Sequence, residues 1–395
     1  MLTLSRRIAV VSRLWGWMTK GHKLKQGLKI LVILVLLYFF LISIKLIGTS
    51  FQLFGRGFAE QLISSYSNPF LGLFTGILAT SLVQSSSTVT SLIVGLVGGG
   101  VLSVEYAIPL VMGANMGTTI TNTLVSLTFV TRKADFRRAF AAATVHDFFN
   151  LCTIIVFFPL EIKFHLIQKS ALFLTQIFEG IGGVTFVSPL KWVIDPVAKG
   201  FQHFLINILS LPETVAGIIM LITAAVVVIA SLVYLVRTLR SLTINQAENS
   251  IDRYLFANAF AAMLLGLVLT AVVQSSSVTT SLIVPLVAAG VVALNRAYPF
   301  TLGANIGTTV TAIMASLATV SAINGQMATT VGVTVAFAHL SFNVYGVALF
   351  YPLRWLPIFL ATRLARIAAE SKKWAIIFVL MVFYILPLIV VLVAR

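Results

Sequence analysis

The sequence predicts an all-α polytopic membrane protein with two inverted-topology repeats, each containing a re-entrant helical hairpin and a broken transmembrane helix. Hydrophobic residues make up 59% of the 395 residues, charged residues only 10%, and the mean hydropathy is +1.03. A soluble domain is nearer half apolar and a quarter charged. In addition, a polar block occurs twice inside apolar sequence, and equivalent loops of the two copies carry opposite charge balances.

The first predicted region, 1–68, holds a basic N-terminal segment, a transmembrane helix over 29–48 and a linker. The segment before the helix contains Arg6, Arg7 and Arg13 and has no signal-peptide cleavage pattern. Because Lys and Arg are enriched on the cytoplasmic side of membranes, we expect the N-terminus in the cytoplasm. The net charge of +16 has the same explanation, together with contacts to the anionic lipid of the bilayer, and does not indicate nucleic-acid binding.

The next region is the first predicted repeat unit, and it begins with an apolar run over 69–100 that a polar block interrupts. The block VQSSSTVTSLIVGLVGGG starts at Val83, and VQSSSVTTSLIVPLVAAG starts at Val273, within a similar run over 256–294. Each half of an interrupted run is shorter than the about 20 residues that cross a bilayer. We therefore expect helical hairpins that enter the membrane and return, because such breaks are tolerated where they are buried in protein or line a cavity.

Further motif pairs extend the repeat. PLVMGANMGTTIT begins at Pro109 and PFTLGANIGTTVT at Pro299, the same offset as the polar blocks. HDFFN at His146 matches HLSFN at His339. A linker with an amphipathic segment and one transmembrane helix separates the units, and a second amphipathic segment with a C-terminal transmembrane helix follows them. The predicted regions are 1–68, 69–160, 161–255, 256–352 and 353–395.

Apolar runs of spanning length predict the full membrane crossings. They lie at 29–48, 106–130, 139–160, 213–236, 298–320, 329–352 and 374–393.

Charged residues in equivalent loops indicate that the two units have opposite orientations. The loop before the last helix of the first unit carries Arg132, Lys133, Arg137 and Arg138. Its counterpart in the second unit, SAINGQMATT, carries no charge, and the link after each hairpin differs in the reverse sense, with Glu105 in the first and Arg296 in the second. Because basic residues mark cytoplasmic loops, the comparison predicts inverted repeats, which many secondary transporters share.

The polar blocks supply hydrogen-bonding groups without formal charge. At each hairpin tip, one arm ends near Gln84 or Gln274 with unpaired carbonyl groups, and the next arm begins at the serines with unpaired N–H groups. A helix N-terminus carries about half a positive charge and a C-terminus about half a negative charge. A serine hydroxyl can cap the helix and also donate to an oxyanion. The tips are therefore predicted to bind an anion and a cation close together.

The GAN segments are predicted to add a second break to each unit. Gly113 and Gly117, with their counterparts Gly303 and Gly307, would permit unwound backbone with free carbonyl groups. Hydroxyl, amide and carbonyl oxygens without a carboxylate suit a weakly held hard cation such as Na⁺. All 11 acidic residues, and all lysines and arginines, lie outside the hairpins and the GAN segments. The anion is therefore expected to be neutralised by helix dipoles and by co-bound cations.

Four further polar residues of the repeats are expected to have structural roles. Asn150 and Asn343 should hydrogen-bond across helices. His146 and His339 should make structural hydrogen bonds rather than relay protons.

Three motifs resemble those of a known family. They are the paired QSSS blocks, the pair GANMGTT and GANIGTT, and ADFRRAFAAATVHDFFN over Ala134–Asn150. With these motifs the chain resembles the type II sodium/phosphate cotransporters over both repeat units. The resemblance implies import of inorganic phosphate coupled to Na⁺ symport by alternating access, no enzymatic activity, and no cofactor apart from Na⁺ as the coupling ion. It is compatible with a homodimer. Animal members carry a large disulfide-bonded loop between the repeats, whereas 161–212 is short and lacks cysteine, which implies a bacterial-type member in the inner (plasma) membrane.

The resemblance also implies the site residues. Phosphate is expected between the two tips, at Gln84, Ser85, Ser86, Ser87, Gln274, Ser275, Ser276 and Ser277. One Na⁺ is expected at Gln274, Ser275, Thr308 and Thr311, with Gln84 nearby. By pseudo-symmetry the candidates for another Na⁺ are Ser85, Thr118 and Thr121, and the GAN segments add Asn115 and Asn305. No metal other than Na⁺ is expected.

Three alternatives would use the same residues differently. The nearest is a transporter of another oxyanion, such as arsenate or sulfate, or one coupled to H⁺. An intramembrane serine hydrolase would pair Ser85 or Ser275 with His146 or His339, but the chain has no G-x-S-x-G motif, and a hydrolase has no use for two inverted copies. A passive anion channel would need a ring of basic residues, which the tips lack.

Overall fold

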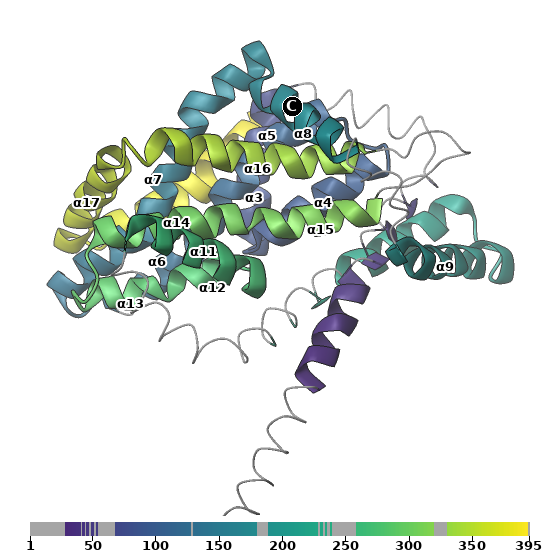
Figure 1. The fold of residues 1–395 in the computed structure, drawn as a ribbon, viewed down its shortest axis with the longest axis horizontal. Helices are drawn as coiled ribbons and strands as arrows, with labels where there is room; N and C mark the ends of the chain where they lie inside the picture. Colours follow the sequence, from purple (N-terminus) through teal and green to yellow (C-terminus); the bar gives the residue numbers. More distant parts are fainter. Residues whose placement is uncertain are drawn as a thin grey trace, which may run out of the picture.

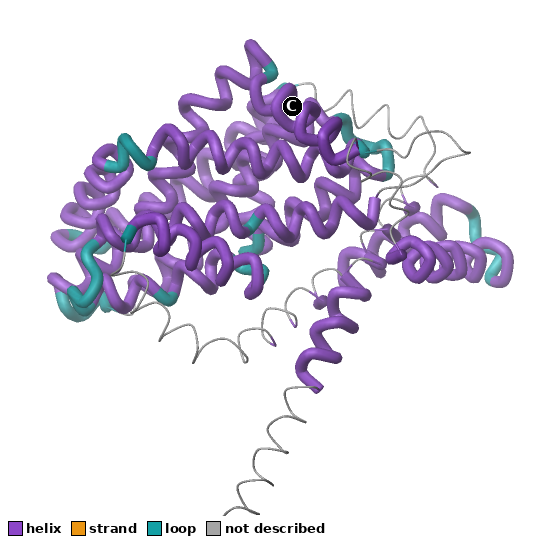
Figure 2. The backbone as a smooth tube through the Cα atoms, viewed as in Figure 1, coloured by secondary structure: helices purple, strands orange, loops and turns teal. Residues whose placement is uncertain are grey.

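The computed structural model describes residues 28–40, 68–127, 129–179, 189–227, 258–319 and 330–393, with isolated positions between 42 and 53 and between 230 and 238. Every regular element in these residues is a helix (Figures 1 and 2). In the described part of the chain, the predicted all-α class is therefore confirmed.

The N-terminal part of the described chain begins with a helix over Leu28–Phe40. It continues through α3 (Pro69–Val83), α4 (Ser86–Gly98), α5 (Val104–Met116), the 3₁₀ helix η1 (Gly117–Thr119), α6 (Ile120–Leu127), α7 (Lys133–Phe164) and α8 (Leu166–Phe178).

The C-terminal part contains α11 (Ala259–Val273), α12 (Ser276–Ser281), α13 (Ile283–Ala288), α14 (Leu294–Gly307), α15 (Thr309–Thr319), α16 (Val331–Phe350) and α17 (Trp355–Glu370). Between the two parts lie α9 (Pro189–His203), η3 (Phe204–Ile208) and a helix over Glu213–Val227. After α17 come α18 (Lys373–Leu380), η4 (Met381–Ile385) and α19 (Leu386–Val393).

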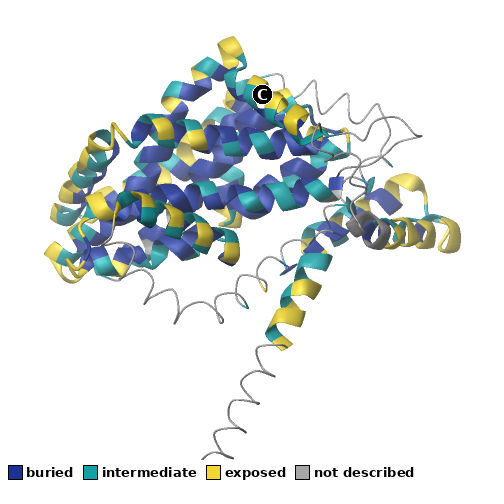
Figure 3. Cartoon of the chain, in the orientation of Figure 1, coloured by how far each residue is buried: buried dark blue, intermediate teal, exposed yellow. Residues whose placement is uncertain are grey.

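Four of the predicted transmembrane helices have the length and apolar composition to cross a membrane. They are Lys133–Phe164, Leu294–Leu317, Val331–Phe350 and Lys373–Val393. These four helices differ in burial. In Lys133–Phe164, 78% of the apolar stretch lies inside the protein, whereas in Lys373–Val393 only 11% does. Figure 3 shows the same contrast, with α16 and its neighbours largely buried and exposed positions gathered at the periphery.

Three predicted spans have a different form. The span expected at 106–130 is divided into α5, η1 and α6, because a 3₁₀ turn replaces the α-helix at Gly117–Thr119. The helices described within 29–48 and 213–236 are Leu28–Phe40 and Glu213–Val227, both shorter than a full crossing. In the remainder of those two spans the structure describes only isolated positions, which are helical.

Short helices flank each polar block. α3 and α11 have 15 residues each, about 22 Å at 1.5 Å per residue, which is less than the hydrocarbon core of a bilayer. Both begin at an asparagine cap that sequence patterning did not single out. Asn68 Oδ1 accepts the Phe70 N–H at 2.9 Å, and Asn258 Oδ1 accepts the Ala261 N–H at 2.8 Å. A two-residue turn then joins each helix to the next, α4 or α12.

The prediction that Gly113 and Gly303 unwind the backbone is wrong, because both lie inside helices, α5 and α14. A Cβ on Gly113 would lie 1.9 Å from the Leu73 carbonyl oxygen, and one on Gly303 would lie 1.8 Å from the Met263 carbonyl oxygen. The glycines therefore permit backbone-to-backbone packing of α5 on α3 and of α14 on α11, as small residues do between membrane helices. The break falls later, at η1 in one case and at Thr308 in the other.

Candidate functional site

The turn at each polar block has the same backbone geometry. Gln84 has φ 59° and ψ 26°, and Gln274 has φ 59° and ψ 24°. This left-handed conformation is uncommon for a side chain other than glycine, asparagine or aspartate. Each glutamine N–H donates back to a threonine carbonyl, that of Thr80 or Thr270, at 2.7 Å. The turn thus ends the first arm and points the chain into the second.

The first serine of each block caps the second arm. Ser85 Oγ accepts the Thr88 N–H at 3.2 Å, and Ser275 Oγ accepts the Val278 N–H at 3.4 Å. α4 and α12 then begin at Ser86 and Ser276, as the serine pattern predicted. The first N–H groups of a helix have no partner within it. Both tips therefore present helix N-termini, with their partial positive charge, at the serines.

The two tips contact each other, although 190 residues separate them. Ser87 Oγ donates to the Gln274 carbonyl oxygen at 3.3 Å. Ser277 Oγ donates to the Thr118 carbonyl oxygen at 3.0 Å, which joins the second tip to the break after α5. The Thr280 hydroxyl accepts an N–H of the Asn122 amide at 2.7 Å. The two tips that carry the predicted phosphate-binding residues are therefore in contact with each other and with the break after α5.

The hydroxyl groups of Ser86 and Ser276 differ from those of their neighbours. Ser85 and Ser275 cap helices, while Ser87 and Ser277 donate across the tips. Ser86 is 2% exposed and Ser276 3%. Neither of these two hydroxyls hydrogen-bonds to another residue in the described part of the chain. A ligand can therefore use both the oxygen and the proton of these two hydroxyls without breaking a hydrogen bond to a described residue.

The residues expected to hold Na⁺ are also grouped, most clearly at the second tip. Thr311 Oγ1 donates to Gln274 Oε1 at 2.6 Å. Thr308 Oγ1 donates to the Ala304 carbonyl oxygen at 3.1 Å, and Thr118 does the same to Ala114 at 3.3 Å. These threonines are at most 4% exposed. The groups offer neutral oxygen atoms only, which suits a monovalent hard cation.

The two tips are not equivalent in their surroundings. Gln274 is buried, with 6% exposure, whereas Gln84 is exposed. At the first tip, Thr121 lies in α6, but its side chain is outside the described residues. Of the two candidate cation-binding groups, the one at Gln274 is therefore the more deeply buried and the more fully described.

Several buried oxygens near these segments have no protein partner in the described part of the chain. They are Thr80 Oγ1, Thr90 Oγ1, Ser91 Oγ, Asn122 Oδ1, Thr123 Oγ1 and Thr270 Oγ1. Thr80 and Thr270 occupy equivalent positions, one turn before the glutamines. Because buried polar atoms in proteins normally have a hydrogen-bond partner, these oxygens are candidates for contact with an ion or with water that accompanies it.

A ring of asparagines lies where the broken helices meet the long helices α7 and α16. The Asn115 amide donates to Asn150 Oδ1 at 3.2 Å and to Asn343 Oδ1 at 2.7 Å. The Asn305 amide donates to the same two oxygens, both at 3.1 Å. Asn150 and Asn343 return hydrogen bonds to the carbonyl oxygens of Asn115 and Asn305, at 3.2 and 3.1 Å. This confirms the expected hydrogen bonds across helices.

The two histidines complete the ring. His146 Nε2 bonds to Asn305 Oδ1 at 2.9 Å, and His339 Nε2 bonds to Asn115 Oδ1 at 3.4 Å. Because an amide oxygen only accepts, Nε2 carries the proton and donates. The histidines thus make the expected structural hydrogen bonds. The side chains of Asn115 and Asn305, predicted as Na⁺ ligands, make hydrogen bonds within this ring. The ring itself is not predicted from the sequence, although each of its residues has a counterpart in the other repeat unit.

Comparison with known proteins identifies relatives along most of the chain. The model of the Na⁺/Pi-cotransporter family matches residues 39–186 and 227–386. The chain is 33% identical to sodium-dependent phosphate transport protein 2B of Homo sapiens, over 94% of the chain and 66% of that protein. It is 35% identical to sodium-dependent phosphate transport protein 2A of Rattus norvegicus, over 92% of the chain and 67% of that protein. The chain thus spans about two thirds of the length of these relatives. No solved structure shows significant similarity.

Proposed function

The chain belongs to the Na⁺/Pi-cotransporter family, and from this premise we propose that it imports inorganic phosphate together with Na⁺ by alternating access. Membership of this family makes it a multi-pass membrane protein and a transporter rather than an enzyme. The observation that carries the proposal is the contact between the two uncharged tips, Ser87 with the Gln274 carbonyl oxygen. The N-termini of α4 and α12 meet there with their serine hydroxyls, and the two tips contain no charged side chain.

In this proposal phosphate binds between Gln84–Ser87 and Gln274–Ser277. The N-termini of α4 and α12 supply partial positive charge, as helix termini do at other anion sites. Ser86 and Ser276 donate hydroxyl hydrogen bonds, since those hydroxyls are not engaged with described residues. Ser85 and Ser275 keep the helices capped, so they position the N–H groups.

The cation binds beside the anion. Gln274, Ser275, Thr308 and Thr311 form one proposed Na⁺ site, because Thr311 and Gln274 already touch and Thr308 lies at the break beside them. Gln84, Ser85, Thr118 and Thr121 form the second, by pseudo-symmetry. Asn115 and Asn305 act through the ring, where they fix the broken helices α5 and α14. No other cofactor is proposed.

We also propose that 69–160 and 256–352 are inverted repeats, each with a re-entrant hairpin. The equal dihedral angles of Gln84 and Gln274 support this, as does the packing of α8 on α16 and of α17 on α7. Regions 1–68, 161–255 and 353–395 flank and join them. The different exposure of the two glutamines supports alternating access, since inverted repeats expose a central site by adopting unequal conformations. Basic loops support a cytoplasmic N-terminus, and the absence of cysteine from 161–212 supports a bacterial inner-membrane protein.

Uptake of labelled phosphate into proteoliposomes tests the function. We expect uptake that requires an inward Na⁺ gradient and ceases when choline replaces Na⁺. Equal uptake in choline would contradict Na⁺ coupling, and stimulation by an imposed pH gradient alone would favour H⁺ coupling. Competition by unlabelled arsenate and sulfate would establish which oxyanion the site selects.

Replacing Ser86 or Ser276 by alanine is expected to raise the KM for phosphate about 10- to 100-fold, because a hydrogen bond to a charged group contributes about 1.5–3 kcal/mol. Kinetics of uptake at saturating Na⁺ provide the measurement. The control is Ser281→Ala in the same segment, because the Ser281 hydroxyl bonds only one turn back, to the Val278 carbonyl oxygen. A Ser276→Ala variant with the KM of the control would remove that serine from the phosphate site.

Thr308→Ala is expected to raise the Na⁺ concentration that gives half-maximal uptake by roughly tenfold, since it removes one neutral ligand from a weak site. Its effect on the KM for phosphate at saturating Na⁺ should be smaller. Thr309→Ala is the matched control, because the Thr309 hydroxyl bonds back to the Ile306 carbonyl oxygen. Unchanged Na⁺ activation in Thr308→Ala would show that the cation assignment is wrong.

A further inference from the structure

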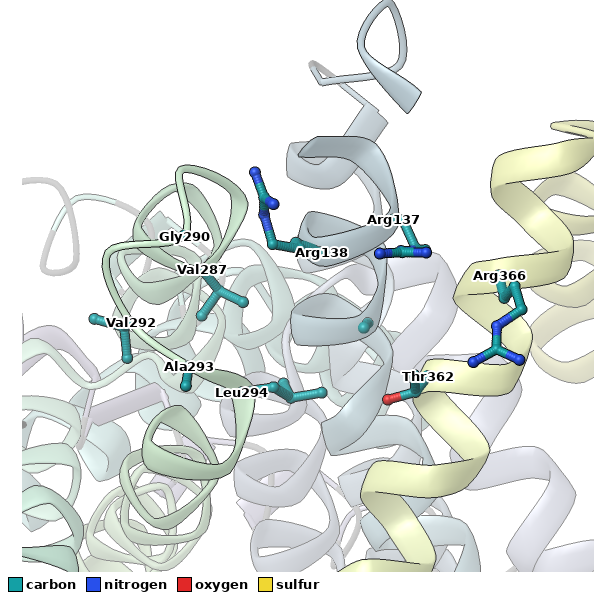
Figure 4. Close-up of a pocket in the computed structure, with 10 residues that line it drawn as sticks. Arg137, Arg138, Val287, Gly290, Val292, Ala293, Leu294, Thr362 and Arg366 are labelled. Carbon is teal, nitrogen blue, oxygen red and sulfur yellow. The ribbon is translucent and has the colours of Figure 1, made fainter. Parts of the chain in front are cut away.

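A cluster of arginines lies away from the tips, at the end of α7 that carries the basic loop. A cavity of about 480 Å³ opens between the first turns of α7, the segment 287–294 and α17. Three arginines line it, Arg137 and Arg138 from α7 and Arg366 from α17. Figure 4 shows Arg137 and Arg366 in the space between α7 and α17, and Arg138 beside Gly290.

The arginines outnumber the carboxylates at this cavity. Arg138 is anchored by its Nε, which donates to the Ala288 carbonyl oxygen at 2.8 Å, and by its Nη2, which donates to Asp135 at 2.8 Å. Within the described residues, neither Arg137 nor Arg366 has an acidic partner within 4.0 Å. Two guanidinium groups therefore face the cavity with no described carboxylate to compensate their charge. Planar guanidinium groups bind phosphate oxygens in pairs of hydrogen bonds.

The remaining lining is mostly apolar, which restricts what occupies the cavity. Val287, Val292 and Leu294 form one wall, while Thr362 adds one hydroxyl on the side of Arg366. A free phosphate ion is polar on all sides and would gain nothing from that wall. A phospholipid offers a phosphate for the arginines and hydrocarbon for the wall, and basic pockets between cytoplasmic ends of membrane helices are typical sites for such headgroups.

We propose that this pocket binds the phosphate group of an anionic phospholipid of the cytoplasmic leaflet. The charge pattern of the loops assigns it to the cytoplasmic side, because both the loop before α7 and the segment after α16 are rich in Lys and Arg. A lipid seated there contacts α7, α17 and the link between α13 and α14 at once. The bound lipid therefore connects the second hairpin to α7, the long helix that carries His146 and Asn150.

Binding of phosphatidylglycerol to the purified full-length protein in detergent tests the proposal. Native mass spectrometry with mixtures of phosphatidylglycerol and phosphatidylcholine should show a preference for the anionic lipid in the wild type. The double variant Arg137→Gln/Arg366→Gln should bind phosphatidylglycerol at least about tenfold more weakly. Arg363→Gln, which removes one positive charge from α17 outside the pocket, is the control, because Arg363 stacks on Phe359 and does not line the pocket; it should keep the preference.

A second readout separates the lipid from free phosphate. Phosphatidylglycerol should raise the melting temperature of the wild type and of Arg363→Gln but not of the double variant, while inorganic phosphate should act equally on all three. Equal lipid binding by the wild type and the double variant would overturn the site. The lipid assignment would be overturned if lipid stabilised none of the three proteins while inorganic phosphate stabilised the wild type and Arg363→Gln but not the double variant.

Discussion

Gly303→Ala is expected to leave little folded protein and to abolish Na⁺-dependent phosphate uptake. The added Cβ would lie 1.8 Å from the carbonyl oxygen of Met263, a backbone atom that cannot turn aside. Helices α11 and α14 would have to separate along the contact that positions the second tip. Overpacking of this kind costs about 1–3 kcal/mol or more, a large share of the roughly 5–15 kcal/mol by which proteins are stable.

Fluorescence-detected size exclusion measures the amount of folded protein, and proteoliposome uptake measures the activity. Gly113→Ala should behave in the same way, because its Cβ would lie 1.9 Å from the Leu73 carbonyl oxygen. Gly200→Ala in α9 is the control, since no atom lies within 4 Å of the added Cβ there. A Gly303→Ala protein with normal yield and uptake would show that α11 and α14 do not pack as closely as described.

Asn305→Ala is expected to destabilise the protein and to reduce transport more than removal of any single tip hydroxyl. The change removes two amide donors and leaves the His146 N–H without its acceptor. Each buried polar group left without a partner costs about 1–3 kcal/mol. Thermal unfolding in detergent measures the loss, and Asn207→Ala on the exposed surface of η3 provides the control.

A double-mutant cycle tests whether the ring acts as one unit. Asn305 and Asn150 share a hydrogen bond, so the destabilisation of Asn305→Ala/Asn150→Ala should be smaller than the sum of the single changes. Independent, additive losses would mean that the asparagines do not form one network. The ring holds the two broken helices against α7 and α16, and it therefore sets the distance between the tips.

Sequence patterning predicted the elements whose signal is local. The serines mark the start of α4 and α12 because serine is favoured at the N-cap of a helix, and the apolar runs at 139–160, 329–352 and 374–393 correspond to helices of spanning length. The candidate tip residues were named from their duplication, and the structure brings the two tips together. Their roles in binding stay predictions.

Features that depend on which helix faces pack against each other could not be predicted from the sequence. The glycines of the GAN segments were interpreted as points of unwinding, since glycine relaxes backbone constraints, but Gly113 and Gly303 serve close packing instead. A single sequence does not say which helix lies opposite a glycine. The ring of Asn115, Asn150, Asn305 and Asn343 joins residues up to 228 positions apart, and only their duplication hinted at it.

Because the tips contain no charged side chain, the bound anion and cation are expected to neutralise each other there. Equilibrium binding of labelled phosphate to the purified protein, with Na⁺ exchanged for choline at constant ionic strength, tests this most directly. We predict that Na⁺ increases the affinity for phosphate, and that phosphate increases the affinity for Na⁺ by the same factor, as linkage requires. Phosphate affinity that is independent of Na⁺ would contradict the account.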